Sequence, residues 1–301
     1  MSHPTPNAPP AVSFGLPVRN GAPTIAQAIE SVLAQTFENW ELVISDNIST
    51  DGTSEICASY AARDRRIRHI PSGRDLSIHE NFRAAFHHSH GTYFRWYGDD
   101  DWLQPQYAER AVAALEASAG SVLCTTVQQY HRDGHPLPVN DPIPLLGGVD
   151  SPDPETRVRA LLHLVQRGGS LGIDPVYALV RRDVAARTGL QNSIRDGDFV
   201  YSCEMALLGP FVHVPEVLAH RRLLSESRIG ISRNIFQREQ SVLYVARASK
   251  GLTTRSRIRV CAALVAFAAR EHAHGVRRRV RAVRDRFYGG GTAAGAGENA
   301  S

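Results

Sequence analysis

The chain has 301 residues, of which 43% are hydrophobic and 21% are charged, and its formal net charge is +4. Those values are typical of a folded globular protein and exclude a fibrous or wholly disordered one. No apolar stretch reaches the roughly 18 residues that a membrane span needs, and the N-terminal residues have no apolar signal-peptide core. The four cysteines show neither zinc nor disulfide spacing, so we expect buried free thiols in a cytoplasmic protein.

Basic residues gather toward the C-terminus. The segment 250–288 holds eleven lysines or arginines and only two acidic residues, whereas the rest of the chain is mildly acidic. A solvated helical face is the commonest interpretation of such a run. Contact with an anionic membrane surface, at the inner face of the membrane, or with a partner helix is the alternative. Nucleic-acid binding is disfavoured, because no stacking aromatics are interleaved with the arginines.

Short apolar runs alternate with helical patterns along the first 130 residues. This alternation predicts an α/β fold with a largely parallel sheet and helices on both faces. In such sheets, ligands bind beyond the carboxyl ends of the strands. Strands are predicted at 11–16 (ending at Pro17), 41–45, 67–70, 93–97 and 122–130, and helices at 23–35, 53–63, 79–89 and 105–117.

The second half has a less regular pattern. A stretch rich in proline and glycine at 133–154 predicts a loop or lid. Helices are predicted at 155–166 and 199–208, strands at 176–180 and 212–218, and a helical segment at 235–287. We expect a disordered N-terminus at 1–10, an α/β domain at 11–228, a basic helical segment at 229–288 and a disordered Gly/Ala tail at 289–301.

Three consecutive carboxylates, Asp99, Asp100 and Asp101, follow the strand predicted at 93–97. Neighbouring carboxylates repel one another and raise each other's pKa, and a hard divalent cation relieves that cost and often brings a phosphate group. The alternative is a polar turn before the acidic first turn of a helix. Polar residues that follow the first two strands, such as Asn20 and Asp46, are expected at the same edge, which favours a metal-diphosphate site.

With these pieces in order, the N-terminal half resembles the family 2 glycosyltransferases, inverting enzymes of the GT-A fold. Four motifs match in the family's order and continue less securely to about residue 228. They are Leu-Pro-Val-Arg-Asn-Gly at 16–21, Asp-Asn-Ile-Ser-Thr-Asp-Gly-Thr at 46–53, Asn81, and Gly-Asp-Asp-Asp at 98–101 (the DXD metal motif) with Pro105 following.

The resemblance implies a nucleotide-sugar-binding half at 11–105 and an acceptor-side half at 106–228. Asp46 would accept a hydrogen bond from the imide N–H of a pyrimidine, which favours a UDP- or dTDP-sugar. Asp100 is the preferred ligand for Mn²⁺ or Mg²⁺, with Asp101 as a second ligand or a helix cap. The residues implied in nucleotide-sugar binding are Pro17, Val18, Arg19, Asn20, Asp46, Asn81 and Asp99. For Asp51, capping of the following helix is the structural alternative.

The same resemblance places the catalytic carboxylate at Asp198, ahead of the helix predicted at 199–208. Gly197 stands where the family usually has Glu, which leaves Asp196 as an alternative. Leu224 occupies the place of a family histidine that contacts metal or diphosphate, and Arg222 or His220 is a candidate substitute. Glu204 is either an acceptor contact or a solvated helix residue.

The predicted function is metal-dependent, inverting hexosyl transfer from a nucleoside-diphosphate sugar to an acceptor hydroxyl, with Asp198 as general base. The acceptor is a glycan, a lipid-linked molecule or a small molecule. One alternative is a catalytically degenerate GT-A-like protein that binds nucleotide-sugars, because the family Glu and His are missing. The other is a sugar nucleotidyltransferase, which is disfavoured because 16–23 lacks a glycine-rich basic loop for a triphosphate.

Overall fold

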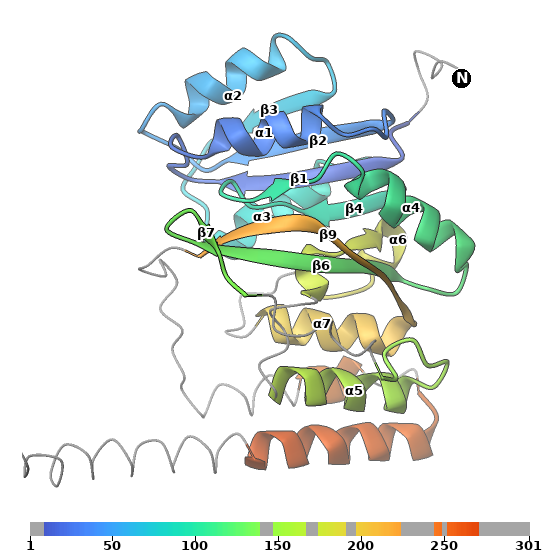
Figure 1. Cartoon of the computed structure of the whole chain (residues 1–301). Helices are drawn as coiled ribbons and strands as arrows, with labels where there is room; N and C mark the ends of the chain where they lie inside the picture. The colour runs from blue at the N-terminus through green and yellow to red at the C-terminus, as the bar shows by residue number, and fades with distance from the viewer. Residues whose placement is uncertain are drawn as a thin grey trace, which may run out of the picture.

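The structure is a computed structural model that describes residues 9–138, 147–166, 174–190, 197–223, 244–248 and 252–270. Residues 1–8 of the N-terminus predicted to be disordered at 1–10, the tail predicted at 289–301, Asp196 and Leu224 lie outside the described residues. One sheet forms the upper part of the molecule, and helices are layered beneath it (Figure 1).

The N-terminal half of the sheet is parallel, as predicted. Its central strand β1 (Val12–Val18) lies between β2 (Trp40–Asp46) and β4 (Tyr93–Trp96), and β3 (Ile67–Pro71) pairs with β2. Every residue of β1 and β2 is buried, as expected of a parallel sheet covered on both faces. The connecting helices are α1 (Ile25–Leu33), α2 (Thr53–Ala61) and α3 (Ile78–His87).

The C-terminal half of the sheet is mixed, so the prediction of a largely parallel sheet holds for the first four strands only. The full strand order is β3-β2-β1-β4-β8-β6-β9-β5, with β7 on β6. Strand β8 (Leu179–Arg181) is antiparallel to β4 and β6 (Leu123–Arg132), and β9 (Phe211–Leu223) is parallel to β6. Strand β5 (Trp102–Leu103) follows β4 closely in the chain yet pairs with β9, so the sheet curls back on itself. Neither β5 nor β7 (His135–Pro136) is long enough to show the alternation of apolar and polar residues that predicts a strand.

Strand β1 continues through Pro17 instead of ending there. Pro17 pairs in register with Ser45 of β2, whereas β4 pairs with β1 only as far as Gly15. The backbone nitrogen of residue 17 points toward the β4 side, like the Gly15 carbonyl that accepts from Tyr97. A proline therefore removes no ladder hydrogen bond at this position.

Helices cover both faces of the sheet, as predicted. On one face, β1 and β2 pack against α1 and α4 (Tyr107–Ala117). On the other, α5 (Pro154–Gln166), α7 (Gly197–Leu208) and a helix at 254–270 build a second core. Trp96 of β4 meets Tyr201 of α7 edge to face, with ring centroids 5.1 Å apart. A 3-10 helix (Pro175–Tyr177), a short α6 (Arg182–Ala185) and a helical turn at 244–248 complete the described helices.

The cysteines are free, and three of them are buried as predicted, whereas Cys261 is only half-buried. Among the helices in the described ranges, none combines the length and the apolar character that crossing a bilayer requires.

Candidate active site

A hydrogen-bonded loop network ties the ends of β1 and β2 together. Asn20 has a left-handed backbone with φ of 58°, and its side-chain oxygen accepts from the backbone N–H of Thr50 at 2.9 Å. The backbone N–H of Asn20 donates to the hydroxyl of Ser49 at 2.9 Å. Asp51 accepts from the backbone N–H of Thr53 at 3.2 Å, but the N-cap position of α2 is Gly52 and has no side-chain cap, so Asp51 closes the turn before the helix and is not the expected cap residue. The two predicted nucleoside loops therefore form one unit.

Asp46 lies at the base of this network and is only 1% exposed. Its carboxylate accepts from the backbone N–H of Ser49 at 3.2 Å and from the Ser54 hydroxyl, and it lies 3.3 Å from Nε2 of His69. Burial favours a raised pKa for Asp46, but hydrogen bonds from Ser49, Ser54 and His69 outweigh burial and hold the pKa below its usual value. Asp46 is therefore a charged acceptor. A nucleobase N–H that binds here would share the carboxylate oxygens of Asp46 with these internal donors.

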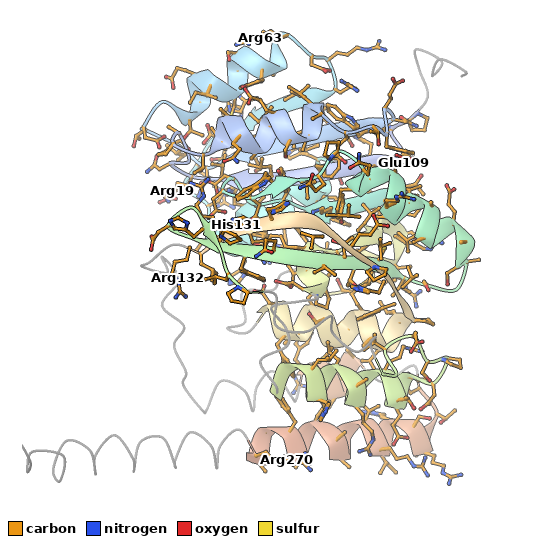
Figure 2. The ribbon with its side chains drawn as sticks, viewed as in Figure 1. Arg19, Arg63, Glu109, His131, Arg132 and Arg270 are labelled. Atoms are coloured by element: carbon orange, nitrogen blue, oxygen red, sulfur yellow. The ribbon has the colours of Figure 1, made fainter. Side chains whose placement is uncertain are left out.

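The remaining predicted donor residues divide into framework and surface groups. Asn81 is 5% exposed, accepts from the Ser45 hydroxyl at 2.7 Å and donates to the Val18 carbonyl at 3.2 Å. It thus fastens α3 to β1 and β2. Pro17 and Val18 are buried in β1, whereas Arg19 is half-exposed and pairs with Asp75 at 2.6 Å. Figure 2 shows Arg19 toward the same edge of the molecule as His131 of β6.

Two glycines, Gly21 and Gly98, allow the carboxylate triplet to pack closely, a role that the sequence argument did not assign to them. A Cβ on Gly21 would lie 2.2 Å from Oδ2 of Asp99, so the first loop and the triplet are in direct contact. A Cβ on Gly98 would lie 2.8 Å from Oδ2 of Asp101 and 3.1 Å from Oδ1 of Asp100. The structure therefore brings together the first loop and the triplet, as the shared strand edge predicted.

Charge is concentrated at this triplet. Burial raises the pKa of Asp100, the neighbouring charge of Asp101 raises it further, and Arg221 and Arg222 oppose the shift. Asp101 is 3% exposed, and its Oδ2 has no hydrogen-bond partner. The nearest opposite charge is Nε of Arg221, at 3.4 Å.

Arg221 is a site residue that the sequence argument missed. Its guanidinium pairs with Asp101 and, through Nη1 at 2.9 Å, with Asp174, and it stacks 3.7 Å from the ring centroid of Tyr177. Burial raises the pKa of Asp174 to about 6, Arg221 opposes that shift, and the charge of Asp198 adds to it. Arg221 therefore links the triplet after β4 to the acidic groups near α7.

The predicted substitutes for the family histidine leave β9 on the face opposite to Arg221, although the charge of Arg222 still acts on Asp100. Residues 220 and 222 of β9 alternate with residue 221, so their side chains leave the opposite face of the sheet. His220 stacks on Trp102 with centroids 5.0 Å apart, and Arg222 donates to Oε1 of Gln27 at 3.0 Å. Alternation along β9 is the signal that separates Arg221 from its two neighbours, but its use requires knowing that β9 pairs with β5.

Asp198 lies in the first turn of α7 with an exposed side chain, where the helix dipole favours a carboxylate. Its backbone carbonyl accepts from the Ser202 hydroxyl at 2.7 Å. The negative charge of Asp198 acts on Asp174, the carboxylate that pairs with Arg221.

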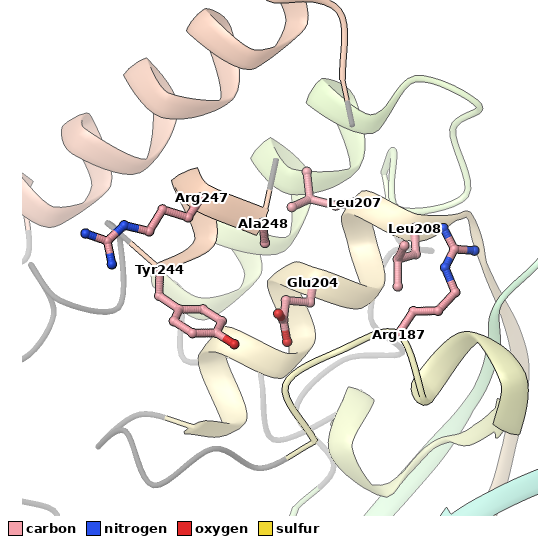
Figure 3. A pocket seen from close by; sticks show the side chains of 7 residues that line it. All are labelled: Arg187, Glu204, Leu207, Leu208, Tyr244, Arg247 and Ala248. Atoms are coloured by element: carbon pink, nitrogen blue, oxygen red, sulfur yellow. The ribbon is translucent and has the colours of Figure 1, made fainter. Parts of the chain in front are cut away.

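Glu204, further along α7, is 7% exposed, so its interpretation as a solvated helix residue is wrong. It accepts from the backbone N–H of Gly189 at 3.0 Å, and burial raises its pKa. Glu204 lines a cavity of about 330 Å³ together with Arg187, Leu207, Leu208, Tyr244, Arg247 and Ala248 (Figure 3). None of the residues predicted to bind donor or metal lines this cavity, so we assign the candidate site to the strand edge.

A divalent cation fits the triplet only in part. Across the described ranges, no three His, Cys, Asp or Glu side chains are grouped to hold a metal ion. Cations such as Mg²⁺, however, commonly bind one or two carboxylates and complete their shell with water and substrate phosphates. Asp100 and Asp101 approach the same glycine, and the buried Oδ2 of Asp101 lacks a hydrogen bond, which matches that mode.

Comparison with known proteins defines the class. The sequence pattern of the family described as Glycosyl transferase family 2 matches residues 13–189, more than half of the chain. The chain therefore belongs to glycosyl transferase family 2, which confirms the resemblance found in the motifs.

Curated relatives match over part of their length. The chain is 36% identical over 111 residues to the putative glycosyltransferase EpsE of Bacillus subtilis (strain 168), covering 36% of this chain and 40% of that protein. It is 28% identical over 133 residues to the putative teichuronic acid biosynthesis glycosyltransferase TuaG of the same organism, covering 44% and 52%. The matches thus span about half of these relatives or less.

Solved structures share the fold. S. aureus TarS 1-349 in complex with UDP-GlcNAc superposes with a TM-score of 0.61 at 15% identity, covering 85% of this chain and 72% of that chain. The mannosyltransferase PcManGT from Pyrobaculum calidifontis, in complex with GDP-Man and Mn²⁺, superposes with a TM-score of 0.57 at 16% identity, covering 91% and 77%. The fold is GT-A, as predicted.

Proposed function

We propose that this protein transfers a sugar from a nucleoside-diphosphate sugar to an acceptor hydroxyl, with inversion at the anomeric carbon. One observation carries the proposal: a series of contacts links the loop after β1 to acidic groups near α7. Gly21 approaches Asp99, Arg221 pairs with both Asp101 and Asp174, and the charge of Asp198 acts on Asp174. This linkage supports a transfer that needs a donor loop, carboxylates and a base close to one another.

The donor side is the loop network at the ends of β1 and β2. The charged Asp46 is an acceptor for the imide N–H of a pyrimidine base, which favours a UDP- or dTDP-sugar. Support for a nucleotide-sugar comes from structural neighbours that hold UDP, UDP-GlcNAc or GDP-Man. Of the residues assigned to the donor, Arg19 is exposed and Asn20 is half-buried, whereas the buried Asn81 acts by holding α3 against β1 and β2.

The diphosphate side is the carboxylate triplet. We assign Asp100 and Asp101 as the ligands of Mn²⁺ or Mg²⁺, and a neighbour in complex with Mn²⁺ supports this choice of metal. The cation, when bound, would supply Lewis-acid stabilisation of the leaving diphosphate. Arg221 fixes the side chain of Asp101 and offsets negative charge at this edge.

On the acceptor side, Asp198 takes the proton of the acceptor hydroxyl. The acceptor oxygen then forms a bond to the anomeric carbon as the bond from that carbon to the diphosphate oxygen breaks, and the nucleoside diphosphate leaves. An exposed carboxylate in the first turn of a helix is suited to this role, because solvent access admits the acceptor hydroxyl to it.

The alternatives have less support. A degenerate binding protein needs no exposed base, yet Asp198 and the complete triplet are present. A nucleotidyltransferase is disfavoured by membership of the glycosyl transferase family. The catalytic domain at 11–228, the cytoplasmic location and contact of the basic C-terminal segment with the membrane remain predictions from sequence.

The proposed base is tested by Asp198→Asn. Loss of a positioned general base costs about 10²–10⁴ in rate, so turnover should fall by that factor while UDP binding stays near normal. Turnover would be measured as UDP release from UDP-sugars with hydroxyl acceptors, and binding by calorimetry. Near-normal turnover in this variant would refute the assignment.

A further inference from the structure

The helix at 254–270 has one face buried in the protein and another turned outward. Val260, Leu264 and Phe267 are 0–2% exposed and belong to the core beneath the sheet. Phe267 stacks on Phe199 of α7 with centroids 5.3 Å apart. Figure 1 shows this helix as the outermost layer, beyond α5. Its outer face therefore belongs to the surface of the molecule.

That outer face carries an apolar stripe. Ile258 is 64% exposed and Val265 is 61% exposed, the two highest values among the exposed large hydrophobic residues in the described ranges. They are two helical turns apart, so they share a face, and the exposed Ala262 and Ala269 lie on the same stripe. The other exposed large hydrophobics, Ile48, Ile78 and Val217, lie on separate elements. The stripe is thus a patch rather than scattered apolar residues.

Arginines flank the stripe on both sides. Arg255, Arg259 and Arg270 lie along one border and Arg257 along the other, and all four are exposed. Figure 2 shows Arg270 at the end of the helix. Residues 252–270 contain no acidic side chain. In the described part of the chain, Arg259 is the one arginine of the four that forms an ion pair, with Glu155 of α5 at 3.3 Å, and it is still half-exposed.

We propose that this face, defined by Ile258, Ala262, Val265 and Ala269 with the flanking arginines, binds the surface of an anionic lipid bilayer. An apolar stripe bordered by arginines matches the boundary between acyl chains and anionic headgroups, and the helix lies in the plane of that interface. The flanking arginines are positively charged and complement an anionic bilayer, whereas an apolar protein surface would leave them without partners. This face gives a specific location to the membrane contact predicted from the basic C-terminal segment, and it does not depend on the proposed transfer reaction.

The test is flotation of the full chain with vesicles of phosphatidylcholine alone or with one quarter phosphatidylglycerol. The wild type should float with the anionic vesicles only, and Ile258→Glu/Val265→Glu should stay in the soluble fraction. Ile78→Glu/Val217→Glu adds the same two charges at other exposed hydrophobic residues and should float like the wild type. Arg255→Gln/Arg257→Gln should weaken partitioning by about fivefold per arginine, because each basic residue contributes about 1 kcal/mol near an anionic surface.

Several results would overturn the proposal. They are no flotation of the wild type with anionic vesicles, unchanged flotation of Ile258→Glu/Val265→Glu, or a dimer in light scattering that this variant abolishes without any vesicle binding. The arginine variant gives an independent readout if Ile258→Glu/Val265→Glu fails to fold. UDP binding measured on the same samples separates this proposal from the proposed function, because loss of vesicle binding should leave nucleotide binding intact.

Discussion

Arg221 and Asp101 form the central ion pair of the candidate site, with Nε of the arginine 3.4 Å from Oδ2 of the aspartate. The pair joins β9 to the loop after β4, segments more than 100 residues apart in the chain. Because the same guanidinium also holds Asp174, removal of one side chain should disturb both the triplet and the acidic groups near α7.

Arg221→Met should destabilise the protein by about 3 kcal/mol, because it leaves buried carboxylates without a counter-charge. The measurement is the free energy of unfolding in urea. The double variant Arg221→Met/Asp101→Asn should recover part of the loss, since it removes one of the unpaired charges. An equal or larger loss in the double variant would show that the charge of Asp101 is not what Arg221 balances.

Asp174 should make stability depend on pH. Its pKa is raised to about 6 in the folded protein, above the value of an unfolded aspartate, so the folded state holds the proton more tightly. The resulting stabilisation is fully present below about pH 4 and is lost as pH rises to about 6, with an upper limit of about 3 kcal/mol. Unfolding curves from pH 4 to 7 should show this decline in the wild type relative to Asp174→Asn. Parallel curves for the two proteins would contradict the raised pKa.

Gly21→Ala should impair metal-dependent nucleotide binding more than it impairs stability. The new Cβ would lie 2.2 Å from Oδ2 of Asp99, a side-chain end that moves aside more easily than backbone does. We expect Mn²⁺-dependent UDP affinity to fall by roughly tenfold, which is a binding loss of about 1.4 kcal/mol. Gly73→Ala is the matched control, because a Cβ there meets nothing within 4 Å. Equal affinities in the two variants would remove Asp99 from the site.

Asn81→Ala should lower stability by about 1–3 kcal/mol, because it leaves the buried Ser45 hydroxyl and the Val18 carbonyl without their partner. If Asn81 affects UDP binding only by holding β1 and β2 in place, Asn81→Ser should regain part of both the stability and the UDP affinity that Asn81→Ala loses. Recovery of stability without any recovery of affinity would instead indicate a direct donor contact. Urea unfolding and calorimetry on the same preparations give the two values.

The sequence predicted the features that depend on local pattern. Continuous apolar runs identified the four parallel strands, and the rule that ligands bind at the carboxyl ends of strands brought Asn20, Asp46 and the triplet to one edge. The hydrogen bond from Thr53 to Asp51 likewise depends on immediate neighbours, although the helix cap itself falls at Gly52.

Features that depend on long-range pairing were missed. Arg221 reaches Asp101 only because β9 pairs with the two-residue strand β5, and such a short strand has no period to detect. The burial of Glu204 depends on the packing of residues 244–248 and the loop at Gly189 against α7, which one sequence does not reveal. The antiparallel position of β8 follows from the same kind of distant contact.

The most direct test of the central claim, a nucleotide-sugar site built on the triplet, is a thermal-shift panel. UDP, dTDP, GDP and CDP would each be tested with and without Mn²⁺, on the wild type and on Asp100→Asn. A ligand at 100 times its dissociation constant stabilises by about 2.7 kcal/mol. We predict a Mn²⁺-dependent shift for UDP or dTDP that Asp100→Asn abolishes. No shift with any nucleotide would contradict the account and favour a degenerate GT-A protein.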